Sequence, residues 1–242
     1  MDGTRERERT VRRTAAGAVV GALVAAMLVT AAPVATAASE PCFGQNPTIV
    51  GTDGPDQIVG TAGADVIRAG AGNDQVEGMG GNDRICGDAG DDFLSGGDGQ
   101  DRISGGDGND GIYGRDGDDL ELGGPGDDEL TGGGGDAGAD VLRGGAGNDY
   151  LLGQNGADRM SGGADDDVLQ GDGDGDHENG GPGNDLVTGD MGDDVLLGGA
   201  GDDQVFGNDS DDLLDGGEGI DTLNGGYGGD DCVNGESAVA CE

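Results

Sequence analysis

The fold of this chain is decided by the nine residues Gly144-Gly145-Ala146-Gly147-Asn148-Asp149-Tyr150-Leu151-Leu152. They have the form G-G-x-G-x-D-x-U-x, in which U is a large aliphatic residue. The closely spaced glycines can adopt positive φ, so the first six residues form a tight turn on which carbonyl oxygens converge. Asp149 adds a carboxylate to this turn, and the last three residues are long enough only for a very short strand.

This motif recurs twenty times between residues 51 and 234. The register runs unbroken from residue 51 to 131, resumes at 135 and runs to 224, and ends with a copy at 226–234, so residues 132–134 and 225 are extra glycines. The first position is Gly in nineteen copies, the fourth is Gly in seventeen, and the eighth is aliphatic or Met in eighteen. The sixth position is Asp in every copy: Asp56, Asp65, Asp74, Asp83, Asp92, Asp101, Asp110, Asp119, Asp128, Asp140, Asp149, Asp158, Asp167, Asp176, Asp185, Asp194, Asp203, Asp212, Asp221 and Asp231. A generic acidic surface would not place Asp at the same position of every nine-residue repeat.

The pattern resembles the RTX, or hemolysin-type, calcium-binding nonapeptide repeat family, and the resemblance covers residues 51–234. It implies an all-β fold, a right-handed parallel β-roll in which two repeats form each coil and calcium ions lie between the turns stacked along each edge. It also implies that the twenty sixth-position Asp side chains and the carbonyl oxygens of the glycine turns are the calcium ligands. Calcium takes about 6–8 oxygen ligands, which two facing turns could supply.

A coil of two repeats predicts a second period of two motifs, and the second position of the motif shows it. From residue 105 onward this position alternates between Gly and a larger residue, which indicates two chemically distinct edges. The larger residues are Arg115, Asp136, Gln154, Asp172, Asp190, Asn208 and Tyr227. We expect residues 132–134 to bulge outward without changing this phase, and Asp149 to share ions with the turns of Asp128 and Asp167.

Two copies lack an aliphatic eighth residue. Around Glu121, the apolar neighbours Leu120 and Leu122 predict a slip of one residue that turns them inward. The copy that contains Glu178 has no apolar residue facing inward, so we expect this coil to pack poorly or to loop out. His177 is the only histidine, and we expect it to be exposed rather than a metal ligand or a catalytic base.

The composition excludes several classes of protein. With 59 Gly and 2% aromatic residues, the chain has too little bulk for an ordinary globular core, and it lacks the Gly period and the Pro content of collagen. Residues 38–242 contain 6 Arg, no Lys and 48 acidic residues, for a net charge of −42. This charge repels nucleic acid and anionic lipid, so neither is an expected partner. The expected partners are calcium ions, and the sequence does not identify a protein or cell-wall partner.

Residues 1–37 have the pattern of an export signal. Arg-rich residues 1–13 precede an apolar run from Ala15 to about Val34, and small residues follow that suit cleavage after Ala37 or Ala38. The alternative is a retained membrane anchor. A twin-arginine signal is less suitable because no bulky apolar residues follow the arginine pair. We therefore expect an extracellular protein, free or associated with the cell surface, whose mature chain does not insert into membrane.

Four cysteines in an exported chain indicate two disulfide bonds. Of the three possible pairings we favour Cys42–Cys86 with Cys232–Cys241, because each bond would then hold one end of the array. The expected organisation is a signal peptide at 1–37, a linker or cap at 38–50, β-roll repeats at 51–234 and a C-terminal cap at 235–242.

Catalysis is not expected, because the sequence has no H-E-x-x-H, no G-x-S-x-G and no second histidine, and only 38–50 and 235–242 lie outside the array. The few buried aliphatic residues offset too little of the chain entropy, so folding should depend on calcium. The sequence predicts a secreted calcium-binding repeat protein with a structural or interaction role. The alternatives are a cell-surface adhesin and a calcium-dependent module accessory to an extracellular enzyme.

Overall fold

The structure is a computed structural model, and it describes residues 42–135, 138–235 and 237–241. The signal peptide predicted at residues 1–37 and its cleavage position therefore lie outside the described residues. The described part of the chain contains no helix with the length and hydropathy needed to cross a membrane.

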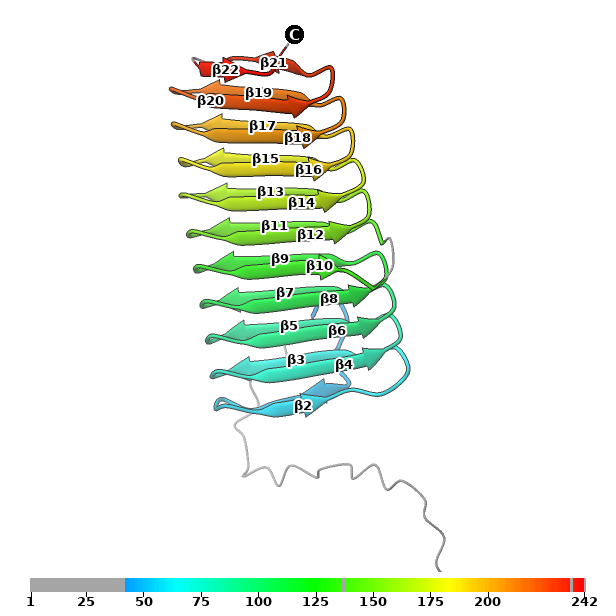
Figure 1. Cartoon of the computed structure of the whole chain (residues 1–242). Coiled ribbons are helices and arrows are strands. Elements are labelled where there is room, and N and C mark those ends of the chain that lie inside the picture. The colour runs from blue at the N-terminus through cyan, green and yellow to red at the C-terminus, as the bar shows by residue number, and fades with distance from the viewer. Residues whose placement is uncertain (1–41, 136–137, 236, 242) are drawn as a thin grey trace, which may run out of the picture. The chain divides into compact units, whose positions relative to one another are not determined.

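Within these residues, 22 strands form two parallel sheets of 11 strands each, stacked as the coils of a solenoid (Figure 1). The odd sheet contains β1 (Ile49–Val50), β3 (Val66–Ala71), β5 (Arg84–Ala89), β7 (Arg102–Asp107), β9 (Leu120–Pro125), β11 (Val141–Ala146), β13 (Arg159–Ala164), β15 (His177–Pro182), β17 (Val195–Ala200), β19 (Leu213–Glu218) and β21 (Asp231–Val233). The even sheet contains β2 (Gln57–Val59), β4 (Gln75–Gly80), β6 (Phe93–Asp98), β8 (Gly111–Asp116), β10 (Glu129–Gly133), β12 (Tyr150–Asn155), β14 (Val168–Gly173), β16 (Leu186–Met191), β18 (Gln204–Asp209), β20 (Thr222–Tyr227) and β22 (Ser237–Val239). The predicted all-β parallel roll with two repeats per coil is confirmed.

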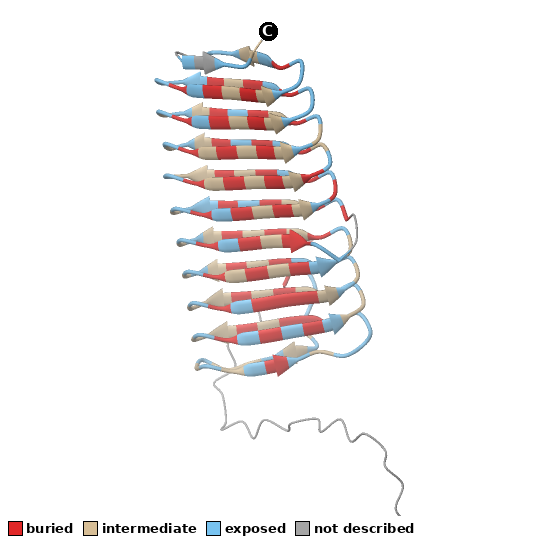
Figure 2. Cartoon of the chain, viewed as in Figure 1, coloured by how far each residue is buried: buried red, intermediate tan, exposed pale blue. Residues whose placement is uncertain are grey.

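Each strand begins at the seventh position of one repeat and, in most coils, ends at the third position of the next. The eighth-position side chains point between the two sheets, while the seventh and ninth point outward, which gives the alternation of buried and exposed residues in Figure 2. The buried eighth-position residues include Ile58, Ile67, Val76, Ile85, Leu94, Ile103, Ile112, Leu130, Leu142, Leu151, Met160, Leu169, Val187, Leu196, Val205, Leu214 and Leu223. Burying one such side chain contributes roughly 1.5–3 kcal/mol.

The slip predicted around Glu121 is wrong, and the coil that contains Glu178 does not loop out. Glu121 pairs in register with Ile103 and Leu142, so no slip occurs and its side chain points into the core. Glu178 also faces inward, from the regular strand β15. The ladder hydrogen bonds of the coils on either side fix the register, and a slip would break them. His177 is exposed, as predicted.

The three extra residues in the middle of the array follow Gly133 and do not begin at residue 132. Gly132 and Gly133 are the last two residues of β10, and Gly133 pairs with Gln154, a second-position residue. Strand pairing therefore assigns the second position of this copy to Gly133 rather than Asp136, which lies outside the described residues. The pairing partners are 21 residues apart here instead of 18, as for Leu130 and Leu151.

The register of the last copy also differs from the prediction. Cys232 pairs with Leu214 and packs against the core, so Cys232 rather than Val233 has the eighth position. The copy therefore starts at Gly225, which is not an extra residue, and its sixth position is Asp230 and not Asp231. Two adjacent aspartates made both alignments possible, and strand pairing selects one.

Both predicted disulfide bonds are present. Cys42 bonds to Cys86 on β5, and Cys232 on β21 bonds to Cys241. In addition, the guanidinium of Arg102 lies 5.6 Å from the ring centre of Phe43. These contacts attach the segment before the repeats to β5 and β7 and the segment after them to the last coil.

From Met79 onward, the non-glycine residues at the second position of the motif have positive φ. They adopt the left-handed helical region, as Asn208 does at 78°, whereas Gly199 lies at 119°, where side chains are rarely found. A Cβ on Gly199 would also lie 2.0 Å from the carbonyl oxygen of Gly181 in the preceding coil.

We therefore expect Gly199→Ala to destabilise the roll by about 1–3 kcal/mol or more, through backbone strain and the clash with Gly181. Asn208→Ala, at a second position that already has a side chain, should cost less, because it loses only the amide hydrogen bond to Asp190, worth about 0.5–1.5 kcal/mol. Thermal unfolding in saturating calcium measures both. Equal effects of the two substitutions would contradict this account of the turn.

Candidate metal sites between stacked turns

The sixth-position aspartates form two rows, one along each edge of the roll, and each Asp stands directly before a strand. The Asp56 row contains Asp56, Asp74, Asp92, Asp110, Asp128, Asp149, Asp167, Asp185, Asp203 and Asp221. The Asp65 row contains Asp65, Asp83, Asp101, Asp119, Asp140, Asp158, Asp176, Asp194, Asp212 and Asp230. All of them except Asp56 are buried. Asp231, predicted as a ligand, is exposed at a seventh position.

One carboxylate oxygen of each Asp joins neighbouring coils. The backbone N–H of Asp128 donates to Oδ1 of Asp149 at 2.8 Å, and the N–H of Asp149 donates to Oδ1 of Asp167 at 2.8 Å. The same bond recurs along both rows. The neighbours of Asp149 are therefore Asp128 and Asp167, as the period of two repeats predicts.

The other carboxylate oxygen, Oδ2, is buried, and in fifteen of these aspartates it makes no hydrogen bond. The fifteen are Asp74, Asp83, Asp92, Asp101, Asp110, Asp128, Asp149, Asp158, Asp167, Asp176, Asp185, Asp194, Asp203, Asp212 and Asp230. Burying an unpaired ionised oxygen costs several kcal/mol. The rows therefore offer oxygens that a cation would satisfy.

The glycines leave room for these oxygens and bring carbonyl groups close to them. A Cβ on the first-position residue Gly144 would lie 2.1 Å from Oδ2 of Asp149. A Cβ on Gly145 would lie 2.1 Å from the carbonyl oxygen of Gly124, and one on Gly147 would lie 2.2 Å from that of Gly126. The turns of successive coils therefore stack with the carbonyl oxygens of one turn against the glycines of the next.

The donor set fits a hard cation such as calcium. In the described ranges, no three Asp, Glu, His or Cys side chains come close enough together to hold a metal ion by themselves. An ion between two turns would be held by Asp carboxylates and by main-chain carbonyl oxygens. Calcium prefers such all-oxygen sites, whereas zinc prefers nitrogen and sulfur ligands.

The first coil is different. Oδ2 of Asp56 accepts hydrogen bonds from the backbone N–H of Thr52 at 2.6 Å and from its hydroxyl at 2.9 Å. Thr61 makes the same two bonds to Asp65, at 2.6 and 2.9 Å. Both carboxylates are thus satisfied without a cation.

Burial also changes the acidity of the rows. Desolvation raises the pKa of Asp149 and Asp167 to about 7 and that of Asp176 to about 8. The backbone hydrogen bond of each carboxylate lowers its pKa and only partly opposes this effect, and neighbouring carboxylates raise it further. Without metal, the rows therefore bind protons near neutral pH.

Sequence reasoning missed a second ladder, made by the exposed fifth-position residues. Oδ1 of Asp127 accepts a hydrogen bond from the backbone N–H of Asn148 at 2.9 Å, and Oδ1 of Asn148 accepts one from that of Asp166 at 3.0 Å. Asp or Asn occupies the fifth position in twelve of the twenty copies, and this enrichment could have predicted the ladder. The ladder adds further links between coils on the outside of each turn.

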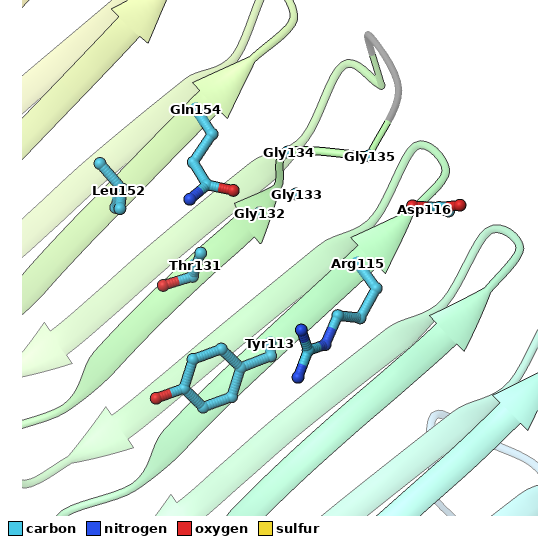
Figure 3. A pocket seen from close by; sticks show the side chains of 10 residues that line it. All are labelled: Tyr113, Arg115, Asp116, Thr131, Gly132, Gly133, Gly134, Gly135, Leu152 and Gln154. Carbon is cyan, nitrogen blue, oxygen red and sulfur yellow. The ribbon is translucent and has the colours of Figure 1, made fainter.

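A pocket of about 490 Å³ opens on the outer face of the even sheet, beside the three-residue insertion (Figure 3). Tyr113, Arg115, Thr131, Leu152 and Gln154 line it. The guanidinium of Arg115 lies 5.5 Å from the ring centre of Tyr113.

Comparison with known families finds that the chain matches the RTX calcium-binding nonapeptide repeat. The matched segments are residues 50–85, 87–121, 122–136, 135–169, 170–205, 188–223 and 206–237. No curated protein matches the chain.

The raised pKa values predict how pH acts on the metal-free chain. A carboxyl whose pKa is higher in the folded than in the unfolded state favours folding when protonated. This stabilisation is complete below the unfolded pKa of about 4 and is lost as the pH rises through about 7 to 8. In excess chelator, the far-UV circular dichroism of β structure should therefore grow as the pH falls from about 8 to about 5. A signal that weakens on acidification would contradict the buried rows.

Asp149→Ala should remove only the ions held with the neighbouring turns of Asp128 and Asp167, because each coil contacts its neighbours alone. Asp231→Ala is the matched control and should keep the full number, since Asp231 is exposed. Calorimetric calcium stoichiometry distinguishes the two variants. Complete loss of binding in Asp149→Ala, or equal losses in both variants, would contradict the assigned rows.

Proposed function

The chain belongs to the RTX calcium-binding nonapeptide repeat family, and from this premise we propose that it is a secreted protein that folds when several calcium ions bind between its stacked turns. Its ligands are the aspartates of the two rows, with Asp230 in place of Asp231, and the carbonyl oxygens of the glycine turns. Asp56 and Asp65, which the threonines already satisfy, contribute least. The protein has a structural or interaction role and no catalytic residues.

The observation on which this proposal rests is the repeated burial of unpaired Oδ2 atoms next to first-position glycines. With 48 acidic residues against 6 Arg in residues 38–242, the chain repels itself when compact. A cation that binds only the folded state adds its binding free energy to folding. Calcium therefore offsets both the charge repulsion and the entropy lost by a glycine-rich chain.

Secretion is supported by two features. The pattern of residues 1–37 is that of an export signal, and the two disulfide bonds suit an oxidising compartment. In this proposal residues 1–37 are removed, and residues 38–50 and 235–242 cap the repeats at 51–234. A chain that stays unfolded at low calcium inside the cell would fold after export, where calcium is higher.

An interaction role is supported by the outer faces of the roll. On the even sheet, the rings of Phe93 and Tyr113 lie 5.0 Å apart beside the pocket of Figure 3, and Tyr150 is partly exposed. These residues favour contact with another molecule, as in a cell-surface adhesin or a module accessory to an extracellular enzyme. Recovery of the protein from the envelope of the producing cell, with and without calcium, separates a bound protein from a free one.

A calcium titration followed by far-UV circular dichroism tests the proposed folding at about pH 8, where the metal-free rows lose their protons. The chain should be largely unfolded in excess chelator and should gain its β signal cooperatively as calcium is added. Magnesium, which keeps its own water ligands and demands octahedral geometry, should be a weak substitute. A complete β signal in chelator at this pH would refute calcium-dependent folding.

A further inference from the structure

Two carboxylates lie inside the roll, at the eighth position of the motif. The other described repeats have a hydrophobic residue at this position. Glu121 on β9 is 0% exposed and lies between Ile103 and Leu142 of the neighbouring strands. Glu178 on β15 is 1% exposed and lies in register with Met160 and Leu196. Neither oxygen of either glutamate makes a hydrogen bond of ordinary geometry, and the backbone groups of Gly114 and Thr188 act only weakly on Glu121 and Glu178.

Around each glutamate, three oxygens converge on one glycine. A Cβ on Gly114 would lie 2.4 Å from Oδ2 of Asp119, 2.5 Å from Oε1 of Glu121 and 2.8 Å from the carbonyl oxygen of Gly132. The carboxylates of Asp119 and Glu121 are therefore close neighbours on the inner side of the Asp65 row.

The surroundings of Glu178 are nearly the same. A Cβ on Gly171 would lie 2.2 Å from Oδ2 of Asp176, 2.7 Å from Oε1 of Glu178 and 2.8 Å from the carbonyl oxygen of Gly189. At the equivalent Gly78, the third neighbour is a methyl carbon of Ile85, at 3.3 Å. Each glutamate thus puts an oxygen where the ordinary repeat has a methyl group.

The charges near the glutamates are all negative in the described part of the chain. Those that act on Glu121 are Asp140, Asp119 and Asp158, and those that act on Glu178 are Asp176, Asp194 and Asp190. No Arg side chain acts on either one. Burying carboxylates side by side without a positive charge is strongly unfavourable, so each cluster needs a cation or a proton.

We propose that Glu121 and Glu178 are ligands of two further calcium ions, held on the interior side of the Asp65 row. Asp119 and the carbonyl of Gly132 complete the first site, and Asp176 and the carbonyl of Gly189 complete the second. The nonapeptide motif does not encode these sites, because its eighth position is aliphatic. The inference rests on the proposed function because the ion is again calcium. It concerns two eighth positions, which are aliphatic in the motif.

Both sites have an extra charged ligand compared with the other turns. Calcium affinity depends on the number of charged ligands and on the rigidity of the site. These sites combine an additional carboxylate with full burial on regular strands. Their ions should therefore be the last to leave when the loaded protein is titrated with chelator.

Native mass spectrometry of the full chain in saturating calcium counts the bound ions directly. Glu121→Leu and Glu178→Leu should each lose one ion, and the double variant should lose two, while the β signal is kept because Leu is usual at this position. Glu77→Leu, which changes an exposed glutamate on β4, is the control and should keep the wild-type number. If a Leu variant does not fold, the count is made on Glu121→Gln and Glu178→Gln, which keep the shape and remove the charge.

An unchanged ion count in the folded variants would overturn the inference and identify the glutamates as protonated core residues. A wild-type chain that binds no calcium would overturn the proposed function as well. The two failures are therefore distinguishable in one series of measurements.

Discussion

The structure depends on a single side chain that recurs once in every repeat, the sixth-position aspartate. Its Oδ1 accepts a hydrogen bond from the backbone of the preceding coil, which joins coil to coil, as between Asp128 and Asp149. Its Oδ2 is buried against a first-position glycine. The same residue therefore aligns the stack and places negative charge inside it. The glycines and the aliphatic residue of each repeat are explained by this placement of the aspartate.

The glycines and the aliphatic residues follow from that constraint. Gly144 leaves the space that Oδ2 of Asp149 fills, and Gly145 and Gly147 let the carbonyl oxygens of the preceding turn approach closely. The eighth-position aliphatic residues fill the narrow space between the sheets with one side chain per strand. So thin a core cannot offset the entropy of ordering a glycine-rich chain together with the repulsion of its carboxylates. In the function proposed above, cation binding to the two rows supplies the remainder and makes the folded state conditional on the metal.

The period of the sequence was sufficient to predict the strands, the inward positions and the neighbours of Asp149. The period was not sufficient where either of two adjacent residues could be assigned to the same motif position. Asp230 and Asp231 differ only in register, and strand pairing, through Cys232 and Leu214, decides between them. The inward position of Glu121 could not be predicted because the hydrophobic residues Leu120 and Leu122 favour a slip, whereas the ladders on both sides of Glu121 and the turn at Asp119 hold the strand in place. The hydrophobic pattern indicates which type of residue a motif position usually has. Strand pairing with the neighbouring coils determines which residue actually lies at that position.

The most direct test of the account is a crystal structure of the calcium-loaded chain with the ions located by anomalous scattering. We predict ions between successive turns along both edges, at about 2.3–2.6 Å from Oδ2 atoms of the two rows and from turn carbonyl oxygens. Ions found only on the exposed fifth-position carboxylates, with the buried Oδ2 atoms in contact with none, would contradict it.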